Sequence, residues 1–273
     1  MTQEPVSLTT SDLYFHRTVS ETPNPEYDLH CHPYYEVFYL LRGDVSYRIE
    51  GAEYALSPGM LLLMPPGAFH GVRILSGRPY DRIAIHFLPG VLTGEAAHVL
   101  LTPFRAGGAC ITCAEEYRIE EYLSSVLFCA SMPESLRNVA LRPRLEALMA
   151  QICLLDQCTP ADEPAEPALP PVSEIIDHLN RHLSDPTTLD DLSTRFFISK
   201  NQLNRVFRKA TGTTVMSYLS HKRIALAQQL LLDGTSASEA ALRAGFGDYS
   251  TFYRTYRRLS GHSPAEAQKL NIL

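Results

Sequence analysis

The sequence predicts a two-domain α+β protein, in which a β-rich N-terminal part with attached helices precedes an all-α C-terminal part. Residues 10–105 contain many short apolar runs broken by glycine and proline, which is typical of short β-strands. Residues 172–273 instead follow a helical period and contain one unit twice. A proline-rich stretch, residues 159–171, separates the two parts. A chain of 273 residues is long enough to bury two separate cores.

The strands that we expect in the N-terminal part are short. They are residues 37–41, 45–49, 60–64, 72–74 and 83–87. Many short strands with turn residues between them predict a β-barrel or a β-sandwich.

Residues 114–158 change to helical spacing, with one helix expected at 114–130 and a second from Pro133 to about residue 156. In the second helix the apolar residues step by 4, 3, 4 and 3 positions, at Leu141, Leu145, Leu148, Ile152 and Leu155. This spacing is that of a coiled-coil seam two heptads long. Two interpretations stay open: the helix packs against the β-domain, or it pairs with a second copy in a homodimer.

Charge is distributed unequally between the two parts. Residues 1–171 carry 11 basic and 21 acidic residues, so their net charge is 11 − 21 = −10, whereas residues 172–273 carry 13 and 9, which gives +4. A basic module attached to an acidic one indicates that the C-terminal part faces a polyanion. The proline-rich stretch, with five prolines and three acidic residues, predicts a semi-rigid extended linker. We expect a cytoplasmic protein with no membrane partner, because the sequence lacks a signal peptide and any run of about 20 apolar residues.

The C-terminal part repeats itself with an offset of 49 residues. This offset places Phe197 on Phe246, Arg205 on Arg254, Phe207 on Tyr256, Arg208 on Arg257, Lys209 on Arg258 and Gly212 on Gly261. Each copy predicts a helix, a tight turn and a second helix, with Thr188, Ser199, Ser236 and Asp248 at the positions of helix caps. Two copies of a helix-turn-helix unit are therefore expected.

The second helix of each copy has a polar face opposite its apolar face. The residues on these faces are Lys200, Asn201, Asn204, Arg205 and Arg208 in the first copy, and Tyr249, Ser250, Tyr253, Arg254 and Arg257 in the second. Amide and guanidinium groups read base edges or grip phosphates in double-stranded DNA. A single face of this kind is more often a solvated helix surface. Its recurrence at the same place in both copies favours DNA binding.

A continuous amphipathic helix, Val215–Leu232, is expected between the two copies. Its 18 residues would span about 27 Å at roughly 1.5 Å per residue. Successive major-groove faces of B-DNA lie about 34 Å apart, so two units held by this helix could read adjacent turns of the duplex.

These residues resemble the AraC/XylS family of transcriptional regulators over the whole C-terminal part. The resemblance depends on Arg223, Ala227 and Leu230-Leu231 in the connecting helix, and on Gly245-Phe246, Ser250, Phe252, Arg254, Gly261 and Ser263-Pro264 in the second copy. Tyr256 stands where the family usually has Phe, and Ala267 and Gln268 depart from its pattern. The resemblance implies a transcription regulator or activator that binds promoter DNA, recruits RNA polymerase and responds to a small-molecule effector. The base-facing residues that it implies are Asn201, Asn204, Arg205, Tyr249, Ser250, Tyr253 and Arg254.

The N-terminal part contains two groups of spaced residues: His30, His32 and Glu36 followed by Gly43, and then Gly59, Pro65, Gly67 and His70. Their spacing resembles both motifs of the cupins, although Ile74 stands where the second motif usually ends in Asn. The resemblance implies a double-stranded β-helix. Residues two apart on a strand share a face, so the histidines and the carboxylate can converge. Three imidazoles and one carboxylate suit Zn, Fe, Mn or Ni.

We expect this site to be an effector pocket lined by His30, His32, Glu36, Tyr47 and His70, which suits a small polar ligand such as a sugar. No cofactor is required by this interpretation. A divalent transition metal held by His30, His32, Glu36 and His70 is one alternative, and a purely structural set is another. The rival function is a metal-dependent cupin enzyme, an oxygenase or isomerase, fused to a DNA-binding domain. No separate acid, base or substrate-orienting motif supports it, so we expect no catalytic residues.

Overall fold

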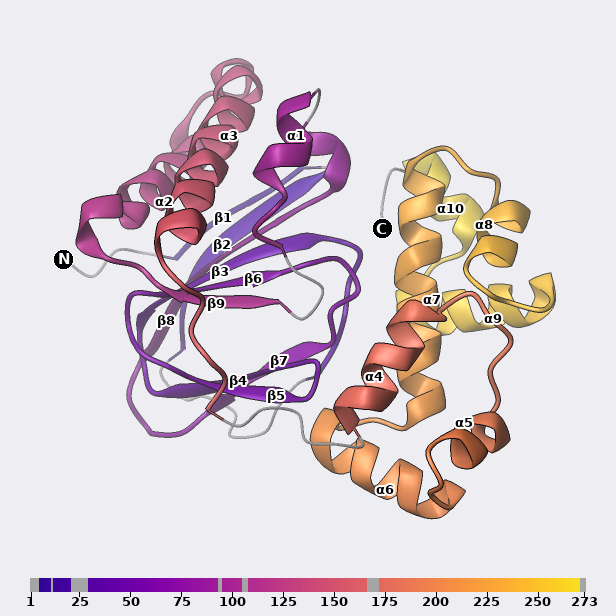
Figure 1. The fold of residues 1–273 in the computed structure, drawn as a ribbon. Helices are drawn as coiled ribbons and strands as arrows, with labels where there is room; N and C mark the ends of the chain where they lie inside the picture. Colours follow the sequence, from indigo (N-terminus) through magenta and orange to yellow (C-terminus); the bar gives the residue numbers. More distant parts are fainter. Residues whose placement is uncertain are drawn as a thin grey trace.

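The computed structural model describes residues 5–10, 12–20, 29–92, 95–104, 108–165 and 172–270. Its N-terminal part consists of two antiparallel sheets that close into a barrel (Figure 1). One sheet has the order β1-β2-β8-β3-β6-β9 and the other β5-β4-β7. The strands are β1 (Val6–Thr9), β2 (Leu13–Ser20), β3 (Tyr35–Arg42), β4 (Val45–Ile49), β5 (Ala52–Leu56), β6 (Met60–Met64), β7 (His70–Ile74), β8 (Tyr80–Phe87) and β9 (Ala109–Thr112).

The predicted limits of the barrel, residues 10–105, are too narrow at both ends. Strand β1 begins at Val6 and pairs with β2, and β9 pairs with β6 at the opposite edge of the six-stranded sheet. Only four residues long, β9 follows a region without strand periodicity, which is why its pairing could not be recognised from the sequence.

Strand β3 is apolar on both faces because both faces are covered. Val37 and Tyr39 belong to the core that lies beneath the helices outside the six-stranded sheet. Phe38 and Leu40 belong to the core between the two sheets. This explains why the sequence shows a continuous apolar run here and no alternation.

Two helices cover the outer face of the six-stranded sheet (Figure 1). They are α2 (Ile119–Leu127), which short 3-10 turns at Glu115–Tyr117 and Phe128–Ser131 flank, and α3 (Glu134–Cys158). The predicted heptad seam lies on α3, where Leu145, Leu148, Ile152 and Leu155 are completely buried against the barrel core. The seam is therefore used inside one chain, in agreement with the first of the two interpretations.

The remaining helices, apart from α1 (Glu95–Leu100) and a 3-10 turn at Pro89–Val91, form the C-terminal domain. They are α4 (Val172–Arg181), α5 (Leu189–Arg195), α6 (Lys200–Thr211), α7 (Val215–Leu232), α8 (Ala237–Arg243), α9 (Tyr249–Ser260) and α10 (Pro264–Leu270). Two cores pack on opposite ends of α7: one involves α4, α5 and α6, and the other α8, α9 and α10. The boundaries of α7 are as predicted. Its one-sided amphipathic character is not, because ten of its residues are buried around the helix.

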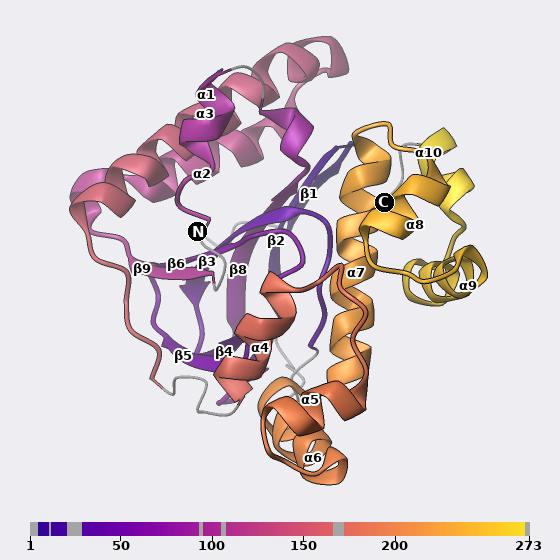
Figure 2. The same cartoon turned by 45° about the vertical axis from the view of Figure 1, so that its right-hand side comes forward.

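Helix α7 also lies against the barrel (Figures 1 and 2). Phe69, which precedes β7, is part of the core around α4 and α6, and its ring centroid lies 5.6 Å from that of Tyr218 on α7. In the part of the chain that the structure describes, no helix is both long and apolar enough to cross a membrane.

The two helix-turn-helix units differ by one residue in their turns. The caps Thr188 and Ser236 are 48 residues apart, whereas α6 and α9 begin 49 residues apart. Phe197 therefore corresponds to Gly245 and not to Phe246 as the uniform offset predicted. Both residues have a positive φ, 55° and 85° respectively.

Phe197 pays a conformational penalty that glycine would avoid, and its ring is 96% exposed. We expect Phe197→Gly to raise the free energy of unfolding by about 1 kcal/mol in a denaturant titration. Phe197→Ala, which keeps Cβ, should show no such gain. At the matching position Gly245→Ala should destabilise, because a Cβ there would lie 2.8 Å from Ser184 Cα. Equal effects of the glycine and alanine variants at Phe197 would contradict the strain.

Candidate functional site

Helix α6 presents a polar face to solvent because its apolar face is fixed in the core. Ser199 begins the helix, with its Oγ accepting the N–H of Gln202, and Leu203 and Phe207 are completely buried. The residues on the opposite side are exposed: Lys200, Asn201, Arg205 and Arg208. Lys200 forms an ion pair with Asp190 of α5 at 2.5 Å.

Helix α9 repeats this arrangement. The Asp248 carboxylate accepts the N–H of Thr251 at 2.7 Å, and Phe252 and Tyr256 are completely buried. The exposed residues are Tyr249, Ser250, Arg254 and Arg257. Each unit therefore offers a rigid, capped helix whose solvent face carries hydrogen-bond donors and positive charge.

Two of the predicted DNA-facing residues are only half exposed, Asn204 and Tyr253. The Asn204 side chain accepts the N–H of Val215, the first residue of α7. The first N–H groups of a helix have no partner inside that helix, so Asn204 also has a structural role.

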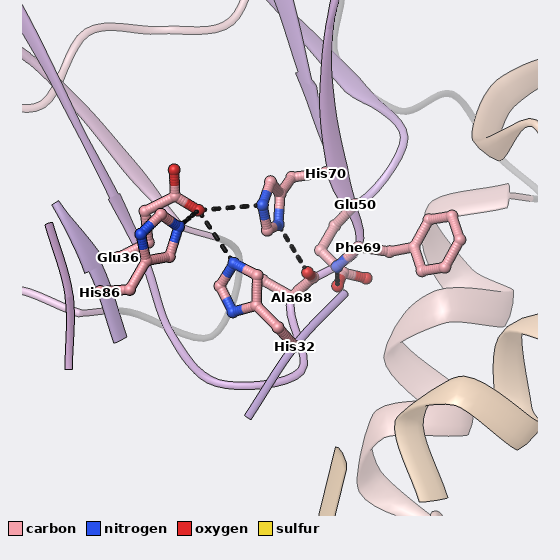
Figure 3. Close-up of polar contacts among 7 residues, drawn as sticks. All are labelled: His32, Glu36, Glu50, Ala68, Phe69, His70 and His86. Carbon is pink, nitrogen blue, oxygen red and sulfur yellow. Dashed lines mark hydrogen bonds and ion pairs between the residues drawn. The ribbon is translucent and has the colours of Figure 1, made fainter. Parts of the chain in front are cut away.

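In the barrel, three histidines converge on one carboxylate oxygen (Figure 3). Glu36 lies on β3 and is 4% exposed. Its Oε2 is 3.0 Å from His32 Nε2, 3.0 Å from His70 Nε2 and 3.3 Å from His86 Nε2. His70 begins β7 and His86 lies on β8, directly opposite Glu36 in the strand pairing.

His70 is oriented from behind by the backbone. Its Nδ1 lies 2.8 Å from the carbonyl oxygen of Ala68, an atom that only accepts hydrogen bonds. Nδ1 must therefore carry a proton, and in neutral imidazole Nε2 then carries the lone pair. That lone pair points toward a carboxylate oxygen. The contact is favourable when a proton or a metal ion lies between the two atoms.

Electrostatics keep Glu36 ionised. Burial acts to raise the pKa of this carboxyl, but the nearby His86, His32 and His70 side chains outweigh burial and hold the pKa well below its usual value. Burial lowers the pKa of His32 despite its hydrogen bond to Glu36. The site thus combines a negative oxygen with one buried imidazole, that of His32, that prefers to be neutral.

The other two predicted barrel residues lie at the margin of this cluster. His30 is exposed and forms a second group of mutually close donor atoms with His32 and His70. Tyr47 is buried in the core between the sheets, where its ring stacks near His70 with centroids 6.1 Å apart. Tyr47 therefore packs beside the His70 ring within the core.

His86 was not among the residues predicted for this site. It lies in the apolar run 83–87 and would be read as a core histidine. One feature of the sequence could have identified it, because His86 is a single histidine within an expected strand of a barrel whose other histidines are expected to face inward.

A cavity of about 390 Å³ opens beside the cluster, at the junction of the two domains. His32, Cys31 and Tyr34 line it from the barrel, and His221, Gln228, Ser260 and His262 are among its lining residues from the C-terminal domain. A larger hollow of about 780 Å³ lies near Val6 and Phe128, away from the histidines.

Comparison with known protein families agrees with both halves of this architecture. Residues 13–170, more than half of the chain, match the AraC-like ligand binding domain. Residues 192–269 match a helix-turn-helix domain. The chain belongs to the AraC family of transcriptional regulators.

AraC-family relatives align over most of the chain. An uncharacterized HTH-type transcriptional regulator, YbfI of Bacillus subtilis (strain 168), is 27% identical over 227 residues, which cover 81% of this chain and 79% of the relative. The HTH-type transcriptional activator RhaS of Escherichia coli O81 (strain ED1a) is 22% identical over 257 residues, 90% of this chain and 89% of the relative. Among solved structures, fatty-acid-bound ToxT from Vibrio cholerae is 10% identical, covers 98% of both chains and gives a TM-score of 0.40.

These findings establish an AraC-family transcriptional regulator with a DNA-binding domain and a ligand-binding domain. The curated relatives named here are regulators and not enzymes.

The structural role of Asn204 in this AraC-family protein is testable. We expect Asn204→Ala to lower the free energy of unfolding by about 1 kcal/mol, because the Val215 N–H loses its acceptor. Asn204→Asp keeps an acceptor oxygen and should retain stability. The measurement is thermal or urea unfolding of the full chain. Unchanged stability in Asn204→Ala would show that the contact with Val215 contributes nothing.

Proposed function

We propose that this regulator binds double-stranded promoter DNA in the cytoplasm by placing α6 and α9 in adjacent major-groove faces. One observation carries the proposal: two capped helices with exposed arginines and other polar side chains are held at opposite ends of the single helix α7 (Figure 2). Ten residues would supply the contacts with bases and phosphates. They are Lys200, Asn201, Asn204, Arg205 and Arg208 on α6, and Tyr249, Ser250, Tyr253, Arg254 and Arg257 on α9.

The DNA contacts can be tested with fluorescently labelled DNA from the intergenic region upstream of the protein's own gene. We expect Arg205→Ala and Arg254→Ala each to weaken specific binding by about 1–3 kcal/mol. Wild-type binding should weaken steeply with salt, because lysines and arginines release the counterions of phosphates.

Arg142→Ala is the matched control for these variants. It removes an exposed arginine from α3, where Arg142 pairs with Glu146 far from the DNA-binding helices, and should leave affinity unchanged. A wild-type chain that binds no DNA at low salt would overturn the proposed function.

For the effector, we propose a small polar, sugar-like molecule that enters the cavity at the domain junction. The volume of about 390 Å³ is within the usual range of small-molecule sites. Gln228, Ser260 and Tyr34 offer hydroxyl and amide groups there, and His32 connects the cavity with the cluster around Glu36. The two partners that the sequence also predicted, RNA polymerase and a second copy of this chain, stay predictions.

A divalent transition metal is a second candidate occupant of the barrel, and the donor set fits one. Metal bonds of about 2.0–2.1 Å place neighbouring donor atoms roughly 2.9–3.4 Å apart, and the three imidazoles lie 3.0–3.3 Å from Glu36 Oε2. His32, Glu36 and His86 would hold the ion, because their donor atoms all lie within 4.8 Å of one another. His70 faces the same carboxylate oxygen, and the Ala68 carbonyl orients its ring in the way typical of metal-binding histidines, but its donor atom groups with those of His30 and His32.

Metal binding can be measured directly on the purified full chain. We expect Zn²⁺ to bind at one equivalent in isothermal titration calorimetry, and His86→Ala to weaken binding at least tenfold, because ligand or outer-shell changes typically cost 10–100-fold. His98→Ala removes an exposed histidine of α1 and is the control. If Zn²⁺, Mn²⁺ and Ni²⁺ all fail to bind, the metal proposal is wrong.

A further inference from the structure

Glu50 is a buried carboxylate of the barrel that bonds to the DNA-binding domain. It lies in the turn between β4 and β5 and is 7% exposed. Its Oε1 accepts the Lys222 ammonium at 2.5 Å and the backbone N–H of Phe69 at 2.7 Å, and its Oε2 accepts the Tyr218 hydroxyl. Tyr218 and Lys222 lie one turn apart on α7 and are themselves buried. One carboxylate thus joins the barrel to the helix that carries both helix-turn-helix units.

The backbone is strained at the residue that makes this contact. Glu50 and Gly51 form a two-residue hairpin loop in which both φ angles are positive, 50° and 83°. Asn, Asp or Gly is favoured at the first position of such a turn. Non-glycine residues with positive φ persist where the surrounding structure holds them, and they cluster at switch regions and binding sites. Here the three bonds to the carboxylate hold Glu50 in place.

Residues Ala68, Phe69 and His70 connect the Glu50 contact with the histidine cluster around Glu36 (Figure 3). The Ala68 carbonyl orients His70, His70 faces Glu36, and the N–H of Phe69 between them donates to Glu50. The ring of Phe69 points the other way, and its centroid lies 5.7 Å from that of His221 on α7. The side chain of His70 is thus connected through Ala68 and Phe69 to the N–H group that positions Glu50.

The closed junction extends to the end of the first DNA-binding helix. Gly212 ends α6, and a Cβ at this residue would lie 2.5 Å from Leu29 of the barrel. Nothing lies within 4 Å of the same position at Gly261, its counterpart in the second unit. Arg48 donates to the carbonyl of Lys209, also near the end of α6, at 3.5 Å. The barrel therefore packs against the C-terminal end of α6 in the first unit and leaves the corresponding end of α9 uncovered at Gly261.

We propose that the Glu50–Lys222–Tyr218 cluster is an autoinhibitory lock between the two domains, and that ligand binding at the histidine cluster opens it. The closed state holds the part of the chain with net charge −10 beside the DNA-binding part with +4, which weakens the attraction of DNA. It also prevents α7 from adjusting the two units to the duplex. The inference rests on the proposed function, because it names how the barrel regulates DNA binding.

The test compares two variants of the full chain that change net charge in opposite directions. Glu50→Gln removes a negative charge and keeps the side-chain volume, and Lys222→Met removes a positive charge. We expect both to bind the upstream DNA about tenfold more tightly than wild type without ligand, a typical size for coupling between sites. A pure charge effect would weaken binding in Lys222→Met, so a gain in both variants identifies the lock. Asp44→Asn, at an exposed residue of the barrel, is the control for Glu50→Gln and should not match its gain.

Two further measurements keep the result interpretable. Small-angle X-ray scattering should give a larger radius of gyration for both variants, and the Phe69 amide should exchange with deuterium faster in Lys222→Met. Tyr218→Phe removes one hydrogen bond and no charge, and we expect a smaller gain in affinity. Open variants with unchanged or weaker DNA binding would overturn autoinhibition, and variants that stay closed would overturn the lock itself. Loss of DNA binding by wild type and all variants would instead overturn the proposed function.

The link from the histidine cluster to the lock is tested with Zn²⁺ as the probe. Zn²⁺ should raise the DNA affinity of wild type toward that of Glu50→Gln and leave Glu50→Gln unchanged. If Zn²⁺ binds and wild-type affinity does not change, the link is wrong. If Zn²⁺ does not bind, the metal proposal fails, and the lock is decided by the Glu50 and Lys222 variants alone.

Discussion

The arrangement of the protein depends on the burial of one helix, α7, by three neighbours. Val215 and Leu219 pack into the core of the first helix-turn-helix unit, and Ile224 and Leu231 into the core of the second. Lys222 contacts the turn between β4 and β5 of the barrel, where its ammonium bonds to Glu50. Close-packed interiors transmit displacement, because their side chains cannot move independently. A shift of the barrel against α7 therefore reaches both DNA-binding helices through one rigid element.

Two of the non-glycine residues with positive φ lie where this chain has a function to perform. Glu50 is in the turn that contacts α7, and Phe197 is in the turn before the first DNA-binding helix. Their surroundings differ. Three bonds hold Glu50, whereas the Phe197 ring is almost fully exposed. Two of those three bonds come from Tyr218 and Lys222 of the other domain, so the strain at Glu50 is offset in part by contacts that exist only in the closed state, and it would favour separation once they break.

The features that could be predicted from the sequence are those encoded within one turn of backbone. The caps at Thr188, Ser199, Ser236 and Asp248 begin helices where expected, because a cap acts within three residues. The barrel could be predicted as well, and so could the convergence of His32, Glu36 and His70. Strand geometry explains only part of this convergence, because Glu36 and His70 lie on strands whereas His32 lies in the segment before β3. The repeat was aligned one residue out at Phe197, because a uniform offset cannot represent an extra residue in one turn.

The contacts that depend on separate elements meeting could not be predicted. His86 is 50 residues from Glu36 in the chain, and only the pairing of β3 with β8 brings them together. Glu50 gave no signal, because a glutamate in a hairpin turn is ordinarily exposed, and its partner Lys222 lies 172 residues away. The coiled-coil spacing of α3 was ambiguous for the same reason. A spacing of 3.5 residues describes an apolar seam and does not identify the surface that covers it.

The chemistry of the domain junction suits a contact that has to open. A buried ion pair contributes little net stability compared with apolar side chains of similar size, because each ion loses its hydration. When the pair separates, Glu50 and Lys222 regain that hydration, so the open state is not penalised as heavily as exposed apolar surface would be. An apolar junction of the same area would leave an exposed hydrophobic patch on each domain after opening, and such patches favour aggregation. Here Phe69 and Leu29 supply the apolar contacts on the barrel side of the DNA-binding core, and the carboxylate supplies the specificity. The junction therefore favours one closed geometry without making separation of the domains prohibitively costly.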